Sequence, residues 1–148
     1  MNTSDVVRKE LRGEVVFTQV SAFGERRLVQ TNLVVNNAYR QLAYLLGYTS
    51  LACVNRMRFG TSGTAPAMGD LNVVPVPAVG FLVTTNTFPS ATSVKFTASW
   101  GPAESSPASF QEVGLFSSDG ILVARVVFSP MMKSVGWTWT IEWTLAYV

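Results

Sequence analysis

The sequence contains no histidine and a single cysteine, Cys53. The absence of histidine excludes Ser-His-Asp and Cys-His catalytic arrangements, and it also excludes a histidine metal site. One cysteine can form neither an internal disulfide nor a thiolate zinc site. Cys53 lies in the apolar stretch SLACV, so we expect a small buried hydrophobic residue rather than a nucleophile. Several common catalytic and metal-centred classes of protein are therefore excluded.

Charge is also scarce, because only 14% of the residues are charged, whereas about 25% is usual in soluble domains. A charge-poor exterior is tolerated when a partner covers it, which favours assembly, although a large core gives the same composition. The net charge of +2 is too small to indicate nucleic-acid binding, and none is expected. No run of about 18 apolar residues exists, so we expect no membrane span. The polar residues 1–5 do not resemble a signal peptide, which predicts a protein retained in the cytoplasm where it is made.

Acid–base chemistry has few candidate residues, since the sequence holds only 9 carboxylate side chains. A glycosidase needs two that face each other, and Glu112 and Glu142 are the candidates. Glu142 is better interpreted as a solvent-facing residue of a strand. The loop FGTSGTAPAMG lacks the Gly-Lys-Ser/Thr of a phosphate-binding loop, and a lone Asp70 is poor support for calcium. We therefore expect no enzymatic activity, no metal and no cofactor.

Alternation of apolar and polar residues predicts a mainly β chain with many short connections. This favours one β-sandwich or jelly-roll-like domain over residues 13–148, preceded by a flexible polar arm, residues 1–12. One stretch, NNAYRQLAYLLGY, has helical spacing and predicts a short helix near residues 37–47. The predicted strands are 13–20, 26–37, 56–59, 80–88, 91–100, 110–116, 121–128 and 137–148.

The last predicted strand, WTWTIEWTLAYV, carries Trp137, Trp139, Trp143 and Tyr147 on one face and threonines on the other. Each buried aromatic side chain removes about 150–250 Å² from water, so this face must be covered by the opposing part of the core or by another subunit. Trp100 closes another alternating strand and is expected to join them. An aromatic platform for sugars or bases is the alternative, but the same face adds no polar groups that would orient a ligand.

Three stretches in this order resemble a known group of proteins: NNAYRQLAYLL with MRFGTSGTAPAMGDLNV, then FQEVGLFSSDGILVARVVFSPMMK, then WTWTIEWTL. They resemble small structural proteins of tailed bacteriophages, found among capsid decoration (cement) proteins and among tail-fibre or collar proteins. The resemblance covers about residues 30–148, and its motifs are structural. It implies that Gly60 and Gly63 shape a turn, Glu112 and Gly114 a hairpin entry, and Lys133 the entry to the final strand.

The resemblance implies a virion protein, assembled in the host cytoplasm and placed on the capsid surface. There it would bind the major capsid protein, bridge neighbouring subunits and stabilise the shell, as a homodimer or homotrimer. No repetitive shaft or receptor-binding tip occurs in the sequence, which favours decoration. The alternative is a tail, collar or fibre attachment protein, including a receptor-binding one. The candidate contact residues are Arg8, Lys9 and Arg12 in the arm, and Val73, Pro75 and Pro77 in the stiff extended segment VVPVPAVG.

Overall fold

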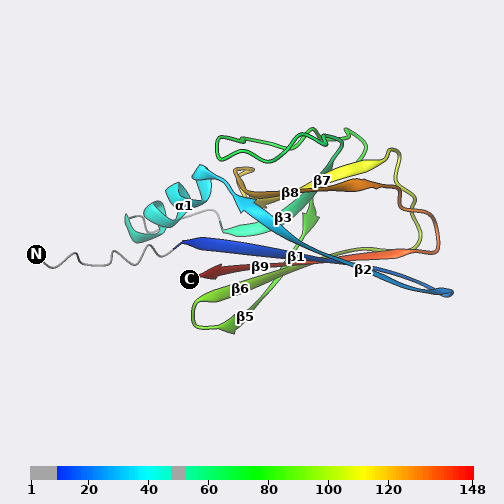
Figure 1. Cartoon of the computed structure of the whole chain (residues 1–148), viewed down its shortest axis with the longest axis horizontal. Coiled ribbons are helices and arrows are strands. Elements are labelled where there is room, and N and C mark those ends of the chain that lie inside the picture. The colour runs from blue at the N-terminus through cyan, green and yellow to red at the C-terminus, as the bar shows by residue number, and fades with distance from the viewer. Residues whose placement is uncertain (1–9, 48–52) are drawn as a thin grey trace, which may run out of the picture.

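The computed structural model describes residues 10–47 and 53–148, which form nine strands and one helix (Figure 1). The prediction of a mainly β domain with one short helix is confirmed. The elements are β1 (Leu11–Ser21), β2 (Gly24–Val34), α1 (Asn36–Gly47), β3 (Val54–Gly60), β4 (Leu82–Val83), β5 (Thr85–Ser90), β6 (Ser93–Trp100), β7 (Phe110–Ser117), β8 (Leu122–Met131) and β9 (Thr138–Tyr147).

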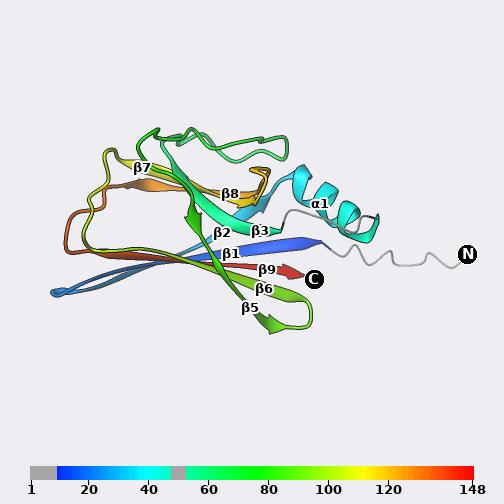
Figure 2. The ribbon, with the colours of Figure 1, turned by 180° about the vertical axis from the view of Figure 1, so that it is seen from behind.

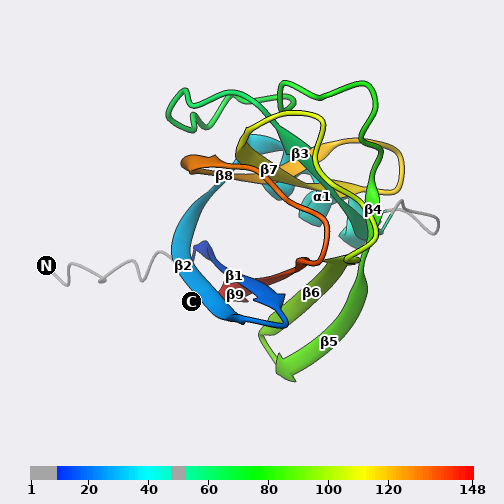
Figure 3. The same cartoon turned by 90° about the vertical axis from the view of Figure 1, so that its right-hand side faces the viewer.

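The strands belong to one antiparallel sheet with the order β4-β3-β7-β8-β2-β1-β9-β6-β5. The sheet curls so far that it nearly closes into a barrel, which the view along the strands shows (Figure 3). Its two halves are joined by β2, whose last residues Leu33 and Val34 pair with Arg125 and Ala124 of β8. Before those residues β2 leaves β8 and pairs with β1 alone. A long seam between β2 and β8 therefore lacks strand pairing.

The two outer strands of the sheet are consecutive in the chain, and Thr84 alone separates them. β4 pairs with β3 in one half, while β5 pairs with β6 in the other (Figure 3). The Thr84 N–H donates to the carbonyl of Asn55 at 2.8 Å, which holds this crossing segment against β3. The stretch 80–88, predicted as a single strand, is thus divided between the two edges of the sheet. This division brings the edges together and almost closes the barrel.

Inward-facing residues of both halves share one core, which is rich in aromatic rings. Trp139 is 1% exposed, Trp143 is 0% exposed and Trp100 is 9% exposed, so all three occupy the core as the alternation predicted. The Trp139 ring lies edge-on to Phe17 and Phe59, with centroid distances of 5.9 and 5.6 Å. Edge-to-face contacts of this kind add to the stabilisation that burial alone gives.

Two aromatic residues of the final stretch depart from the prediction. Tyr147 is 46% exposed because it is the last residue of β9, where the opposing half of the sheet no longer covers it. Trp137 precedes β9 and is half-buried, with the Arg26 guanidinium 5.7 Å from its ring centroid. Tyr147 is therefore not a core residue, and Trp137 lies at the margin of the core.

Two further expectations need correction. β1 begins at Leu11, so Leu11 and Arg12 belong to the sheet rather than to an arm. Glu10 directly precedes the sheet, and its backbone exchanges hydrogen bonds of 2.7 and 3.0 Å with Val148. Cys53, predicted to be buried, is exposed. It lies just before β3, where its carbonyl accepts the Ser118 N–H at 2.8 Å and its side chain faces outward. None of the described helical residues forms a segment long and apolar enough to cross a bilayer.

Candidate functional site

A buried cluster of charges lies on the outer face of β7 and β8, centred on Arg125, whose side chain is 5% exposed. Its Nε donates to Glu112 Oε2 at 2.6 Å, and its Nη1 donates to Asp70 Oδ2 at 2.8 Å. Its Nη2 donates to the carbonyl of Thr64 at 2.9 Å. Burial acts to lower the pKa of Arg125, but the hydrogen bonds and charges of Glu112 and Asp70 outweigh burial and raise the pKa. Arg125 therefore stays charged.

Glu112 is completely buried, and both of its carboxylate oxygens accept hydrogen bonds from within the chain. Its Oε1 accepts the N–H of Ser62 at 3.1 Å and the N–H of Val74 at 2.7 Å. Gly60 lies opposite on β3, where a Cβ atom would collide with the Glu112 carboxylate. Gly60, the first glycine of FGTSG, thus makes room for a buried carboxylate.

These contacts fix the long loop 61–81, which runs over β3, β7 and β8 (Figures 1 and 2). Asp70 Oδ2 also accepts the N–H of Ala67 at 2.9 Å, so the loop is tied at several points. Below the loop a small apolar cluster is buried, and it includes Val73, Phe116 and Leu122. A loop of this length keeps one conformation because ionic and apolar contacts hold it together.

The charged side chains of this cluster bind one another and the backbone of the loop. Both oxygens of Glu112 have partners, and Asp70 pairs with Arg125 rather than standing open to a cation. Glu142, the other candidate for acid–base work, lies on β9 and pairs with Lys95 at 3.3 Å. β7 and β9 are not neighbours in the sheet, so the two glutamates are not brought together. The described residues contain no group of three or more His, Cys, Asp or Glu side chains placed to hold a metal.

A second buried charge, Lys133, lies between β8 and β9 and is 1% exposed. Its Nζ donates to the carbonyl of Glu104 and lies 5.3 Å from the ring centroid of Trp100. The Trp100 Nε1–H donates to the Glu104 carboxylate at 3.1 Å, and the Lys133 N–H donates to Ser106 Oγ at 2.9 Å. The loop 101–109 is thereby attached to the entry of the final strand, which is the place that the resemblance implied for Lys133.

The burial of Lys133 predicts a pH dependence of stability. Burial lowers the pKa of Lys133 below its ordinary value of 10.5, and the charge of Glu104 opposes this only in part. Below the lowered pKa, Lys133 is protonated in both the folded and the unfolded protein. Between the lowered pKa and 10.5, the unfolded protein binds more protons at this residue than the folded protein does. The free energy of unfolding is therefore expected to rise with pH through this window.

Replacing Lys133 with methionine is expected to remove that rise, which urea denaturation at a series of alkaline pH values measures. Lys95→Met is the matched control, because the Lys95 side chain is 35% exposed and lies on the surface. The control is expected to keep the slope of the unreplaced protein. Equal slopes for Lys133→Met and the unreplaced protein would show that Lys133 does not titrate differently on folding.

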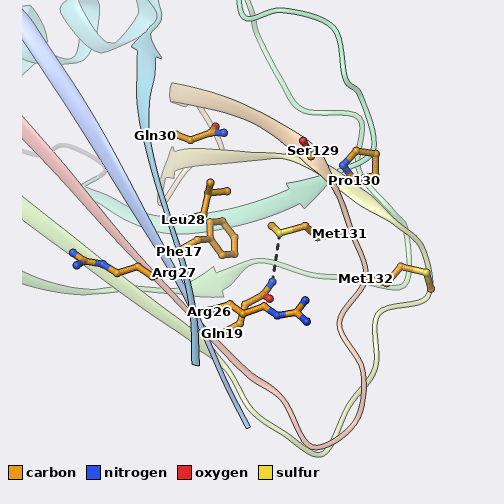
Figure 4. A pocket seen from close by; sticks show the side chains of 10 residues that line it. All are labelled: Phe17, Gln19, Arg26, Arg27, Leu28, Gln30, Ser129, Pro130, Met131 and Met132. Carbon is orange, nitrogen blue, oxygen red and sulfur yellow. Dashed lines mark hydrogen bonds between the residues drawn. The ribbon is translucent and has the colours of Figure 1, made fainter. Parts of the chain in front are cut away.

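Exposed apolar side chains occur on the hairpin of β1 and β2, whose tip projects beyond the rest of the molecule (Figure 1). Phe23 at the tip is 98% exposed, and Val20 and Val29 are 42% and 51% exposed. Beside the half of the hairpin that is nearer the tip, where the start of β2 and the end of β8 diverge, lies a groove of about 450 Å³ (Figure 4). The groove is lined by Phe17, Gln19, Arg26, Arg27, Leu28, Gln30, Ser129, Pro130, Met131 and Met132.

The candidate contact residues are found in different settings. Arg12 is on the surface, where it pairs with Glu10 at 2.6 Å, and Pro77 is exposed while Pro75 is half-buried. Val73 is only 3% exposed because it packs between the loop and the sheet, so its side chain is not available for a partner. Arg8 and Lys9 lie outside the described residues. The extended segment does lie at an edge, since Pro75 forms an isolated bridge with Gly60.

Sequence reasoning missed Arg125 and Phe23. A signal for Arg125 was present, because it is the only charge within the apolar run ILVARVVF, and a charge buried in a strand requires a partner. The partner was Glu112 in FQEVGLF, which occupies the neighbouring strand. Phe23 had no such signal, since the turn SAFGER resembles many surface turns.

The fold and these contacts define a mainly β, antiparallel domain in which buried charges anchor loops and exposed apolar side chains gather on a projecting hairpin. Comparison of the chain with known family models, with curated proteins and with solved structures finds no match in any of the three. Function must therefore be argued from the chain itself.

Proposed function

We propose that this protein is a virion structural protein, a capsid decoration protein that binds the outer surface of the shell and has no catalytic role. The observation that carries the proposal is that the buried charged side chains are engaged within the chain, whereas apolar side chains are exposed. The buried charges Glu112, Arg125 and Lys133 are used to hold loops, while apolar side chains such as Val20 and Val29 are left exposed on a projecting hairpin. Exposed apolar side chains that gather in one region mark surfaces that bind other proteins.

The expected mechanism is mass action on the assembled shell. A ligand that binds assembled capsid subunits, and not the separated ones, stabilises the assembly, and many copies add their contributions. Two features of the fold suit this role: loops anchored by buried charges, and a sheet that is almost closed. We further propose that the fold belongs with sandwich-like or jelly-roll-like domains, because its two halves are joined through only Leu33 and Val34 of β2.

The proposal is tested by immunogold labelling of the parent phage particle with an antibody against this chain. Label distributed over the head supports decoration. Label confined to the tail or neck would replace it with the alternative, a tail, collar or fibre attachment protein. A blot of purified virions that lacks the chain would contradict both.

Residues 1–9 provide a more specific prediction. Deleting them removes Arg8 and Lys9 but leaves Glu10 and β1, so the unfolding curve is expected to stay unchanged. Binding to purified shells is expected to weaken roughly tenfold, since exposed ion pairs contribute about 0.2–1 kcal/mol each. Cosedimentation with shells at low and high salt measures this. Equal binding by the truncated protein would remove these residues from the contact surface.

A further inference from the structure

The tip of the β1–β2 hairpin presents an aromatic ring on a well-defined turn. The register pairs Ser21 with Gly24, so that Ala22 and Phe23 form the turn. The Phe23 N–H donates to Ser21 Oγ at 3.2 Å, and Gly24 has a φ of 149°, which other residues rarely adopt. With a side chain 98% exposed, Phe23 gains nothing from its own chain. The turn thus holds a large apolar side chain in water.

The groove beside the same hairpin is lined by side chains that suit an aromatic ring. Phe17, Leu28 and Met131 point toward one another and form its floor (Figure 4). Gln19 Nε2 donates to the sulfur of Met131 at 3.4 Å, which positions that flexible side chain. A methionine sulfur and a guanidinium both interact favourably with aromatic rings. Arg26 supplies the guanidinium at the rim of the groove.

The groove exists because the sheet is unpaired there. β2 pairs with β8 only through Leu33 and Val34, and toward the start of β2 the two strands separate. A narrower gap without room for water continues along this seam between Val15, Phe17, Leu28, Gln30, Val126 and Phe128. The groove is therefore the part of the seam where the half-buried side chains of Leu28 and Met131 can be reached from outside without breaking any strand pairing.

We propose that Phe23 of one copy inserts into the groove of a second copy, and that the second copy does the same in return. The tip and the groove lie next to each other on one hairpin, so a single two-fold axis can bring both pairs together. Such an interface is self-complementary, as is usual for homodimers. The inference goes beyond the proposed virion role, because self-association is a property of the purified chain and needs no shell.

The test is sedimentation velocity across a concentration series with purified full-length protein. The unreplaced protein is expected to dimerise reversibly, and Phe23→Ala is expected to raise the dimer dissociation constant about tenfold or more, as truncation of a central aromatic contact does. Phe88→Ala is the matched control, because Phe88 is 78% exposed on β5, away from the hairpin. It is expected to leave the dissociation constant unchanged.

A second variant obstructs the groove instead of the ring. Ser129 is exposed and lines the groove, so Ser129→Trp is expected to fill it and to weaken association as Phe23→Ala does. Mixing the two variants restores one of the two contacts, since one keeps its groove and the other keeps its Phe23. The mixture is therefore expected to associate more strongly than either variant alone.

Three results would overturn the proposal. The first is an unreplaced protein that stays monomeric throughout the series. The second is an equal effect of Phe23→Ala and Phe88→Ala. The third is a mixture that associates no better than its components while circular dichroism shows that both variants are folded. A monomer that nevertheless requires Phe23 to bind shells would assign the ring to a different protein and equally exclude the dimer.

Discussion

Replacing Glu112 with glutamine is expected to lower the free energy of unfolding by about 3 kcal/mol, near the lower end of the roughly 3–5 kcal/mol seen when one member of a buried ion pair is removed. Glutamine keeps the shape and one acceptor oxygen for the N–H groups of Ser62 and Val74. It removes the charge opposite Arg125, whose side chain is 5% exposed and retains only Asp70 as an ionic partner. The remaining Asp70 contact keeps the loss from being larger.

Urea denaturation of Glu112→Gln measures this loss. Glu142→Gln is the matched control, because Glu142 pairs with Lys95 at 3.3 Å on the surface and its side chain is 37% exposed. The control is expected to cost less than about 1 kcal/mol, as exposed ion pairs do. A loss of similar size in both variants would mean that the buried cluster does not stabilise the fold through its charges.

Replacing Trp139 with alanine is expected to cost about 3–5 kcal/mol, the usual range for truncation of a buried tryptophan or phenylalanine. The Trp139 ring is 1% exposed, and it also contacts Trp100 and Phe110 with centroid distances of 6.1 and 6.5 Å. Removing it leaves a cavity between the two halves of the sheet. The near-ultraviolet circular dichroism is expected to change as well, because neighbouring rings lose their packing.

Trp137→Ala is the control for this prediction, since the residue lies two positions earlier and is half-buried against Arg26. We expect it to cost about 1 kcal/mol, because only part of the ring leaves an apolar environment. Equal losses at the two positions would contradict the placement of Trp139 at the centre of the core.

The strands and the helix were predictable because their signals are local. The alternation in WTWTIEWTLAYV places Trp139 and Trp143 in the core, and the helical spacing predicts a helix near residues 37–47, where the structure has α1 at Asn36–Gly47. The prediction failed at the ends of strands, where the alternation continues but the opposing half of the sheet no longer covers the side chains. Tyr147 continues the same alternation as the core residues Trp139 and Trp143 and is nevertheless exposed.

The parts that depend on distant neighbours were not predictable. Val73 follows a polar loop and precedes Pro75, so it was interpreted as a contact residue. It is buried because Gly114 leaves space beneath it, and a Cβ atom at Gly114 would collide with Val73, Phe116 and Leu122. The unpaired seam beside β2 likewise depends on the point at which β8 leaves β2. No local sequence pattern indicates that point.

The pairing of β1 with β9 has a consequence for biosynthesis. β9 comes from the far end of the chain, yet it lies in the interior of the sheet between β1 and β6. While the chain is being synthesised, β1 lacks one of its two neighbours and its apolar face stays uncovered until residues 138–147 emerge. Contacts of such long sequence separation slow folding and leave incomplete chains prone to aggregation. We therefore expect the domain to acquire its structure only after residues 138–147 have left the ribosome.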